Sequence, residues 1–323
     1  MDYIGFSIYQ RLFLGDRQSL ADVGAASDEP EAIFPAVANS LDRIVAELGT
    51  KHGVGGVLHF CDIDHLFSQD LIAQPWRDAE KAWAARRRYP FLLGSHIPFS
   101  HDVLPLAPGF VDNFRQATSM CSDLGVDSLV LHAPLIRTTD TDTSFLDLMT
   151  SPPIIDAMAS CSAFMCWENA QDTDAYYRDI GRLVAWRQRL VDRLVDMGCR
   201  QIADRQLFCF DTGHLLLSLQ RDGAGQEQVM THLPEFARHV KVFHIHANDG
   251  TRDQHLIPFL DLKKHHLPEV NPARFVANSK LVMSWIDLVL SHGMIDGRHV
   301  HLESGPPMPV EDVLAFYRGF FER

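Results

Sequence analysis

The sequence predicts an α/β fold, a single (β/α)8 TIM barrel domain that spans residues 1–323. Apolar runs of strand length alternate with segments of helical periodicity eight times along the chain, as is typical of parallel sheets. The long connections follow the predicted strands, and in such a barrel these connections form the catalytic face. A doubly wound open sheet is the alternative, but no Gly-x-Gly-x-x-Gly turn follows an early strand.

Each predicted strand is a short run of aliphatic and aromatic residues, and a segment with apolar residues three or four apart follows it. The first strand reads "YIGFSIY" and the last reads "HVHLES". We expect strands at 3–9, 56–60, 91–97, 128–133, 164–169, 207–214, 240–246 and 299–304. We expect helices near 35–48, 78–88, 110–124, 153–161, 175–197, 225–238, 273–291 and 310–321.

The composition is that of an acidic globular protein. Hydrophobic residues make up 46% of the chain and the net charge is −13, which argues against nucleic acid as a partner without excluding it. The longest apolar runs are too short to span a bilayer, and the N-terminus lacks the features of a signal peptide. We therefore expect a cytoplasmic protein with no membrane partner, whose six scattered cysteines are reduced. A homo-oligomer is compatible with the sequence.

Acidic and imidazole side chains stand near the C-terminal ends of seven consecutive predicted strands. They are His59, His96, His132, Glu168, Asp211 with His214, His246 and Glu303. A single histidine near an apolar run is typically a hydrogen-bonded core residue. Seven such positions on one rim bring like charges so close together that a cation is needed to compensate them. The sequence therefore predicts a divalent metal site at this rim.

Four motifs, "WEN", "CFDTGH", "HANDGTRDQH" and "HLES", resemble those of the xylose-isomerase-like TIM barrel superfamily. That superfamily includes endonuclease IV (AP endonuclease family 2) and the sugar isomerases and epimerases related to tagatose epimerase. The resemblance covers predicted strands 3 to 8. Its isomerase branch implies one manganese, zinc or magnesium ion held by Glu168, Asp211, His246 and Glu303. It also implies that the two glutamates act as acid and base and that His214 contacts the substrate.

The endonuclease IV branch implies three zinc ions instead of one. His96 and His132 resemble the ligands of the first ion, with Glu168 as a bridge to the second. Asp211, His246 and Glu303 resemble the second set, and His214, Asp253 and His255 resemble the third. All nine positions are filled, and Asp249 completes the H-x-x-D pattern that follows the seventh strand.

Two features depart from the endonuclease IV pattern. After His255 the chain reads "LIPFLDLKKHH", where the family continues into a Gly-x-Gly turn. Few basic residues stand on the predicted catalytic face to meet a phosphate backbone: Arg137, Arg252, Lys263 and Lys264. The long connections 10–34 and 247–272 should set the size of the substrate.

Several positions keep an alternative role. His96 and His132 can hydrogen-bond a substrate instead of a metal, and with His59 and Arg252 they form the predicted substrate-binding set. Asp253 and His255 can be ordinary loop residues.

Two further histidines, His244 and His301, lie two residues before His246 and Glu303. Because side chains alternate along a strand, we expect both to point into the barrel one layer lower. There they either orient metal ligands or are core histidines. The same alternation points Trp167 and Phe210 outward, toward the helices, and the pair His265–His266 is expected in a solvated loop.

Three functions compete. An isomerase or epimerase of a small sugar, sugar phosphate or related polyhydroxy or keto compound is favoured by the acidic charge and the absence of a basic rim. A phosphodiesterase of the endonuclease IV type is favoured by the complete set of nine positions. A lyase or a multinuclear iron enzyme is the third, because sites rich in histidine and carboxylate also suit iron. The expected number of ions ranges from one to three per chain.

Overall fold

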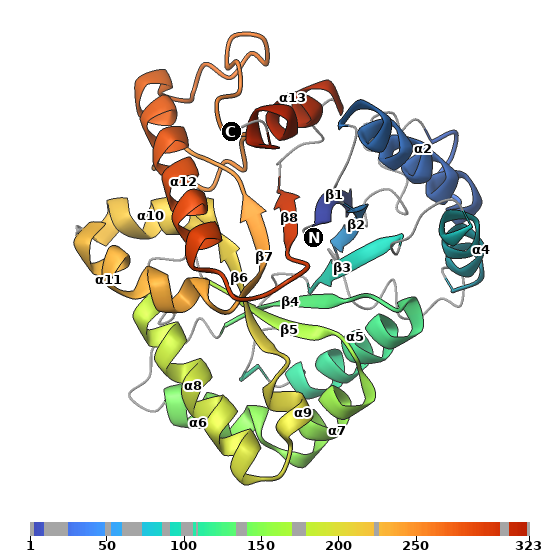
Figure 1. Cartoon of the computed structure of the whole chain (residues 1–323), viewed down its shortest axis with the longest axis vertical. Coiled ribbons are helices and arrows are strands. Elements are labelled where there is room, and N and C mark those ends of the chain that lie inside the picture. Colours follow the sequence, from blue (N-terminus) through green and yellow to red (C-terminus); the bar gives the residue numbers. More distant parts are fainter. Residues whose placement is uncertain are drawn as a thin grey trace.

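The computed structural model describes residues 3–9, 25–48, 53–59, 73–85, 91–97, 106–107, 109–133, 141–169, 179–222, 226–303 and 310–321. Eight parallel strands form a closed barrel in the order β1 to β8, and β1 pairs with β8 to complete it. The strands occupy the centre of the molecule and the helices surround them (Figure 1). The predicted (β/α)8 fold is confirmed.

The strands are β1 (Tyr3–Tyr9), β2 (Gly53–His59), β3 (Leu92–His96), β4 (Ser128–His132), β5 (Phe164–Glu168), β6 (Gln206–Asp211), β7 (Val240–Ile245) and β8 (His299–Leu302). The helices are α2 (Pro30–Leu48), α4 (Ala73–Ala84), α5 (Phe110–Leu124), α6 (Thr141–Met149), α7 (Pro152–Ser160), α8 (Ile180–Asp196), α9 (Arg200–Ala203), α10 (Thr212–Asp222), α11 (Gln226–Ala237), α12 (Pro272–His292) and α13 (Val310–Phe321).

Three helices lie where the sequence predicts a loop or a strand, and the short α9 in the predicted connection before β6 is one of them. Helix α6 occupies the predicted loop after β4, and α10 begins at Thr212, directly after β6. His214 therefore lies in the first turn of α10 and not on the strand, and its backbone N–H donates to Asp211 Oδ1 at 2.7 Å. A carboxylate that accepts from an amide three residues later is a typical N-cap. The helical periodicity is hidden here because three consecutive leucines, Leu215 to Leu217, are all buried.

The main hydrophobic core lies between the barrel and the helices. Trp167 of β5 packs there against Phe145 of α6 and Trp186 of α8, with ring centroids 5.4 and 5.1 Å away. Its indole N–H donates to Gln206 Oε1 at 3.0 Å. Phe210 contacts Phe236 in the same outer core. The prediction that Trp167 and Phe210 point outward is confirmed.

A second, much smaller apolar cluster fills the inside of the barrel. It consists of Val130, Cys166, Leu207, Cys209 and Val242, from strands β4 to β7. The register of β7 against β6 shifts at Lys241, because Phe208 pairs with Val240 and the next residue, Cys209, pairs with Val242. This bulge changes the phase of the alternation, so Val240 packs outward while Val242 packs inward.

Below the small cluster, polar side chains close the N-terminal end of the barrel. Lys241 Nζ lies 2.7 Å from Asp127 Oδ2 and donates to the Gly297 carbonyl at 2.7 Å. Asp127 Oδ2 is also 3.1 Å from His299 Nε2, and His299 Nδ1 is 3.1 Å from Ser128 Oγ. Ser128 and His299 belong to the non-adjacent strands β4 and β8, so this contact crosses the barrel interior.

The five cysteines within the described residues are free thiols, and four of them are buried. Cys61 lies outside the described residues. Among the described helices, none combines the length and the hydropathy that a membrane crossing requires.

Candidate metal centre

Nine of the predicted site residues lie in one cluster at the C-terminal ends of the strands. Contacts of 2.6 to 3.9 Å connect all of them. Strands β3 to β6 supply His96, His132, Glu168 and Asp211; α10 supplies His214; Glu303 follows β8; the segment after β7 supplies His246, Asp253 and His255. Their roles as ligands stay predictions, but the structure brings all nine donors together.

The first group of donors is built around Glu168, which is 1% exposed. Its Oε2 lies 3.3 Å from His96 Nε2 and 3.3 Å from His132 Nδ1. The Ile97 carbonyl, 2.6 Å from His96 Nδ1, orients that ring so that Nε2 faces the carboxylate. Burial lowers the pKa of His132 to about 3. A neutral imidazole beside a carboxylate is the form that binds a metal.

The second group joins Glu168 to Asp211 and Glu303 through His244. The Nδ1 atom of His244 is 2.7 Å from Glu168 Oε1 and 3.2 Å from Glu303 Oε2. It is 3.8 Å from Asp211 Oδ2. Burial raises the pKa of Glu168, but the charge and hydrogen bond of His244 outweigh it and hold that pKa well below its usual range. The sequence left His244 open between a ligand-orienting residue and a core histidine, and the structure places it against the carboxylates of the site.

The third group is centred on Asp253. Its Oδ2 lies 2.6 Å from His255 Nε2 and 3.5 Å from His214 Nε2, and its Oδ1 lies 3.7 Å from His246 Nδ1. The ring of His255 stacks on that of His246 with centroids 4.2 Å apart. Burial lowers the pKa of His255, but Glu303 and Asp253 more than offset this and raise it to about 9.

The local sequence around Asp211 explains the geometry of the "DTGH" motif. Thr212 Oγ1 lies 2.6 Å from the carbonyl of His246 and accepts from its N–H at 3.0 Å, which ties the end of β7 to α10. A Cβ atom at Gly213 would lie 2.0 Å from the His246 ring, so only glycine leaves room for that imidazole. Asn169 exchanges two hydrogen bonds of 2.8 Å with the backbone of Asp211, and its own carbonyl is 2.9 Å from His214 Nδ1.

The "HAND" motif organises the loop that carries the third group. Asn248 donates to the Gly213 carbonyl at 3.0 Å. Asp249 accepts from the N–H and hydroxyl of Thr251 and from the N–H of Asn271. Burial raises the pKa of Asp249, but the hydrogen bonds from Asn271 and Thr251 outweigh it, so the net shift is downward. Asp249 therefore shapes the loop and is in none of the donor groups.

The chemistry of this cluster fits a divalent cation. In this cluster, Glu168 Oε2, His246 Nδ1 and Asp253 Oδ1 are buried and have no hydrogen-bond partner among the described residues. Buried polar atoms that lack hydrogen bonds are costly. All three belong to the cluster, in which the donor atoms of each group of three or four residues lie within 4.8 Å of one another. A bound ion would satisfy these atoms and offset the clustered negative charge.

Of the predicted substrate-binding residues, His96 and His132 lie in the cluster, whereas His59, Arg252 and the other predicted basic residues lie outside it or outside the described residues. His59 ends β2, but its side chain is outside the described part, as is Arg137. Arg252 is exposed and pairs with Glu269 at 3.4 Å. Lys264 pairs with Asp312 at 2.7 Å. His265, expected in a solvated loop, also contacts Asp312, at 3.0 Å, and is only partly exposed.

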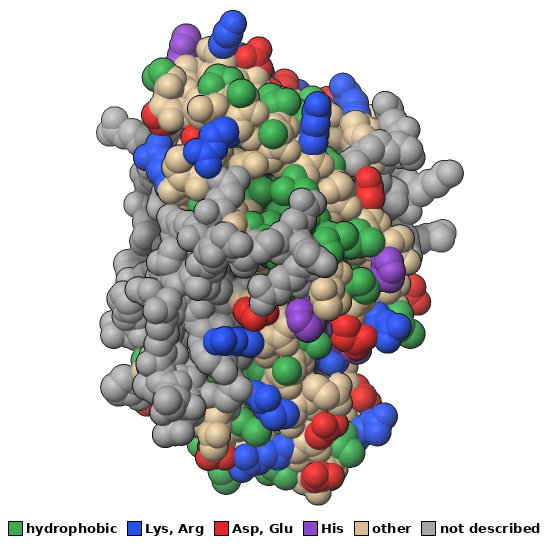
Figure 2. Space-filling view, turned by 90° about the vertical axis from the view of Figure 1, so that its left-hand side faces the viewer, with side chains coloured by type: hydrophobic (Ala, Val, Ile, Leu, Met, Phe, Trp, Pro, Cys, Tyr) green, Lys and Arg blue, Asp and Glu red, His purple; other side chains and the backbone are tan. Residues whose placement is uncertain are grey.

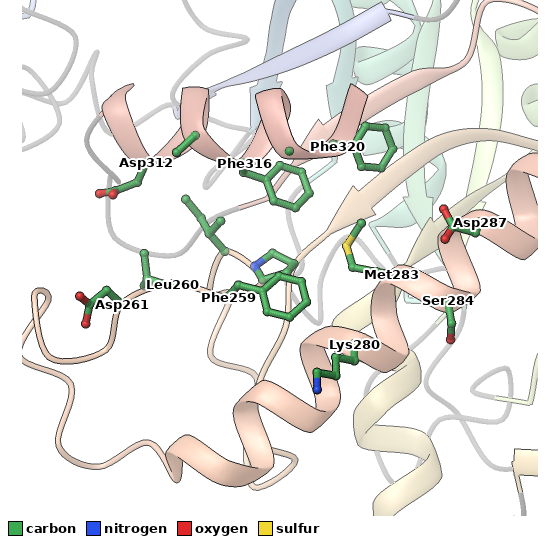
Figure 3. Close-up of a pocket in the computed structure, with 14 residues that line it drawn as sticks. Phe259, Leu260, Asp261, Lys280, Met283, Ser284, Asp287, Asp312, Phe316 and Phe320 are labelled. Carbon is green, nitrogen blue, oxygen red and sulfur yellow. The ribbon is translucent and has the colours of Figure 1, made fainter. Parts of the chain in front are cut away.

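A separate cavity of about 720 Å³ lies between the segment 257–261, α12 and α13. Phe259, Met283 and Phe316 point toward the same space, with Lys280 and Asp312 at its edge (Figure 3). On the face in Figure 2, hydrophobic side chains gather in the upper half, while charged side chains of both signs dominate the lower part. None of the clustered donors lines this cavity. It is distinct from the candidate metal centre, although the segment that forms it begins two residues after His255.

Comparison with known proteins establishes the fold. No protein-family model matches this sequence, and no curated protein sequence matches it. A D-tagatose 3-epimerase-like protein superposes with a TM-score of 0.56 at 13% identity, over 100% of this chain and 96% of the other. Endonuclease IV from Thermus thermophilus gives 0.54 at 15% identity, over 99% of both chains. The chain has the xylose-isomerase-like barrel fold. The IolI protein with a bound zinc atom has the same fold, with a TM-score of 0.52 at 12% identity over 99% of this chain and 96% of the other.

Sequence identities of 12–15% show a shared fold but not a shared reaction. The reaction must be inferred from the chemistry of the site. The resemblance expected from the four sequence motifs is confirmed at the level of the fold. Both branches that the sequence could not separate, epimerases and endonuclease IV, are found among the similar structures.

Proposed function

We propose that this protein is a divalent-metal-dependent isomerase or epimerase of a small sugar, sugar phosphate or related polyhydroxy or keto compound. One observation carries the proposal. Two buried carboxylates, Glu168 and Glu303, approach the same atom, His244 Nδ1, at 2.7 and 3.2 Å. A pair of carboxylates at one small site can exchange a proton with a substrate carbon on either side of it.

The environment of each residue indicates its role, as a metal ligand or as a group that exchanges a proton with the substrate. Glu168, Asp211, Glu303 and neighbouring imidazoles would hold the ion; imidazole donors suit zinc or iron, and carboxylate donors suit manganese or magnesium. A bound ion polarises the carbonyl and hydroxyl oxygens of the substrate and so acidifies the adjacent C–H bond. Glu168, whose pKa is held well below its usual range, is ionised and can accept that proton. Return of a proton to the opposite face gives an epimer, and return to the neighbouring carbon gives an isomer.

The charge around the cluster supports a small substrate. Arg252 and Lys264, two of the four basic residues predicted on this face, are exposed and form surface ion pairs with Glu269 and Asp312. They are not directed at the clustered donors. A nucleic-acid backbone would need several cations at the mouth of the barrel, so these contacts favour a small polyhydroxy compound.

The proposal is tested by solvent exchange. The metal-replete protein is incubated in D2O with a panel of ketoses, aldoses and their phosphates, and deuterium at carbon is measured by NMR. We expect deuterium incorporation, with or without net conversion, for at least one compound of this class. Exchange that equals the protein-free control across the panel would refute the proposal.

A phosphodiesterase is the second candidate, and the third donor group favours it. His214, Asp253 and His255 supply nitrogen and oxygen donors beyond the number that one ion needs. Multinuclear sites stabilise both the attacking and the leaving oxygen in phosphoryl transfer. Nicking of an abasic-site duplex at low salt, or hydrolysis of bis(p-nitrophenyl) phosphate, would place this candidate ahead of the isomerase.

A further inference from the structure

The side chain of His244 occupies a position that the sequence patterns assign to no ligand. It lies on β7, two residues before His246, and it is fully buried. Its ring stacks on that of His96 with centroids 5.3 Å apart, and the ring of His301 packs against it edge-on at 5.2 Å. Register pairs His244 with Asp211 on one side and with His301 on the other. The backbone and both neighbouring rings therefore fix the orientation of this imidazole.

The distances from His244 Nδ1 fit a shared ion. Two ligand atoms that each lie about 2.1 Å from a tetrahedral ion are about 3.4 Å apart. His244 Nδ1 lies 2.7 Å from Glu168 Oε1, 3.2 Å from Glu303 Oε2 and 3.8 Å from Asp211 Oδ2. These three values bracket the expected separation, and the four atoms come from four different strands or strand ends. One nitrogen and three carboxylate oxygens form a complete donor set for one ion.

The position of His246 supports the same division of donors. Its Nδ1 faces Asp253 Oδ1 at 3.7 Å, and both of these atoms are buried without a hydrogen-bond partner among the described residues. Its ring stacks on His255 at 4.2 Å. His246 thus groups with His214, Asp253 and His255, although its Nε2 also lies 3.0 Å from Asp211.

We propose that His244 is a metal ligand, the imidazole donor of the ion held by Glu168, Asp211 and Glu303, and that His246 belongs to the set around Asp253. The proposal rests on the metal dependence proposed above, but not on the reaction. It adds a tenth donor to the nine that the sequence motifs supply. The ten residues then divide into three sets that share only Glu168.

The test is metal binding by the apoprotein, measured without substrate. Wild type, His244→Gln and His301→Gln are stripped with chelator and titrated with Co²⁺, and bound metal and the visible Co²⁺ spectrum are recorded. His301 is the matched control, because it is a buried imidazole one strand away and is in none of the donor groups. Loss of a partner that only orients a ligand typically weakens binding about 10- to 100-fold. For His244→Gln we expect one ion fewer per chain or a weakening beyond about 100-fold. His301→Gln removes only a ring that packs against His244, so it should keep every ion and weaken binding by no more than about 100-fold.

A second variant keeps the proposal testable if His244→Gln fails to fold. Because Nδ1 and not Nε2 faces the carboxylates, a thiolate on the same Cβ reaches nearly the same point. His244→Cys should therefore gain a thiolate-to-Co²⁺ charge-transfer band in the difference spectrum against wild type, and His301→Cys should not.

The outcomes separate this proposal from the proposed function. Wild-type stoichiometry, affinity and spectrum in His244→Gln would overturn the ligand assignment and leave the isomerase proposal standing. A lost ion in His244→Gln, together with no solvent exchange by the wild type, would support the assignment and refute the reaction. A wild-type protein that binds no metal would overturn both.

Discussion

The barrel floor allows one change in stability to be worked out from the structure. The ammonium of Lys241, whose side chain is 5% exposed, is compensated by the carboxylate of Asp127 at 2.7 Å. It also lies 4.9 Å from the centre of the Phe164 ring. We predict that Asp127→Asn destabilises the protein, because it removes the charge that compensates a buried ammonium.

The size of the effect follows from the pKa of Asp127. Burial raises it, but His299 and Lys241 more than offset this, so it falls from 3.8 to about 2. At 1.36 kcal/mol per pKa unit this corresponds to about 2.4 kcal/mol before screening. The Asp127 side chain is 41% exposed, so solvent screens the interaction. We therefore expect a loss of about 1–1.5 kcal/mol in the free energy of unfolding at pH 7.

The pH dependence has a definite sign. Because the folded-state pKa is depressed, the contribution of Asp127 is fully present above pH 3.8 and is lost as the pH falls toward 2. The assay is urea unfolding of wild type and Asp127→Asn from pH 7 to pH 3. The control is Asp204→Asn, which breaks an exposed pair with Arg200, and we expect it to cost less than about 0.5 kcal/mol. Equal losses in the two variants, or a difference between wild type and Asp127→Asn that stays constant down to pH 3, would refute the reasoning.

Three further predictions concern the mouth of the barrel. Glu303→Gln should abolish solvent exchange and leave the circular dichroism spectrum unchanged. The control variant Glu269→Gln, at an exposed carboxylate that pairs with Arg252, should stay active. Full activity of Glu303→Gln would contradict the role of the glutamate pair. Asp253→Asn should lower the metal content without emptying the site around Glu168, and an unchanged content by elemental analysis would make Asp253 a loop residue. Gly213→Ala should displace the His246 ring, because the new Cβ would lie 2.0 Å from it. Metal binding should then weaken at least about 10-fold. Wild-type metal affinity would show that the ring can move at no cost.

The sequence predicts the barrel and the donors of the metal centre for the same physical reason. In a parallel barrel all strands point the same way, so residues at eight separate strand ends meet at one rim. Linear spacing therefore suffices to bring His96 and Glu303 together, although 207 positions separate them in the chain. Nothing similar constrains the loops, and for this reason Arg252 and Lys264, which the sequence could place only near the rim, have surface partners instead.

The phase of strand β7 was harder to predict, because a bulge is not visible in the hydrophobic pattern. Val240 and Val242 are equally apolar and two residues apart, so simple alternation places both on one face. The register shift at Lys241 separates them, and the inward face then continues from Val242 to His244. The shift also leaves Lys241 free to reach Asp127 at the floor. Alternation predicts correctly that His244 points inward, but not which carboxylates it meets, because these belong to β5, β6 and the end of β8.

The layers inside the barrel explain why His244 stands out among the histidines of the chain. Strand β7 passes through three layers of the barrel interior. Lys241 belongs to the polar N-terminal end, Val242 to the small apolar cluster, and His244 to the polar mouth. The His244 imidazole lies one layer above the apolar cluster on the same strand and directs Nδ1 to the carboxylates of Glu168 and Glu303. His244 is fully buried in this position. Low local polarity strengthens each of its interactions with charged groups, and this is the setting in which one additional nitrogen donor has the largest effect on which ions the site binds.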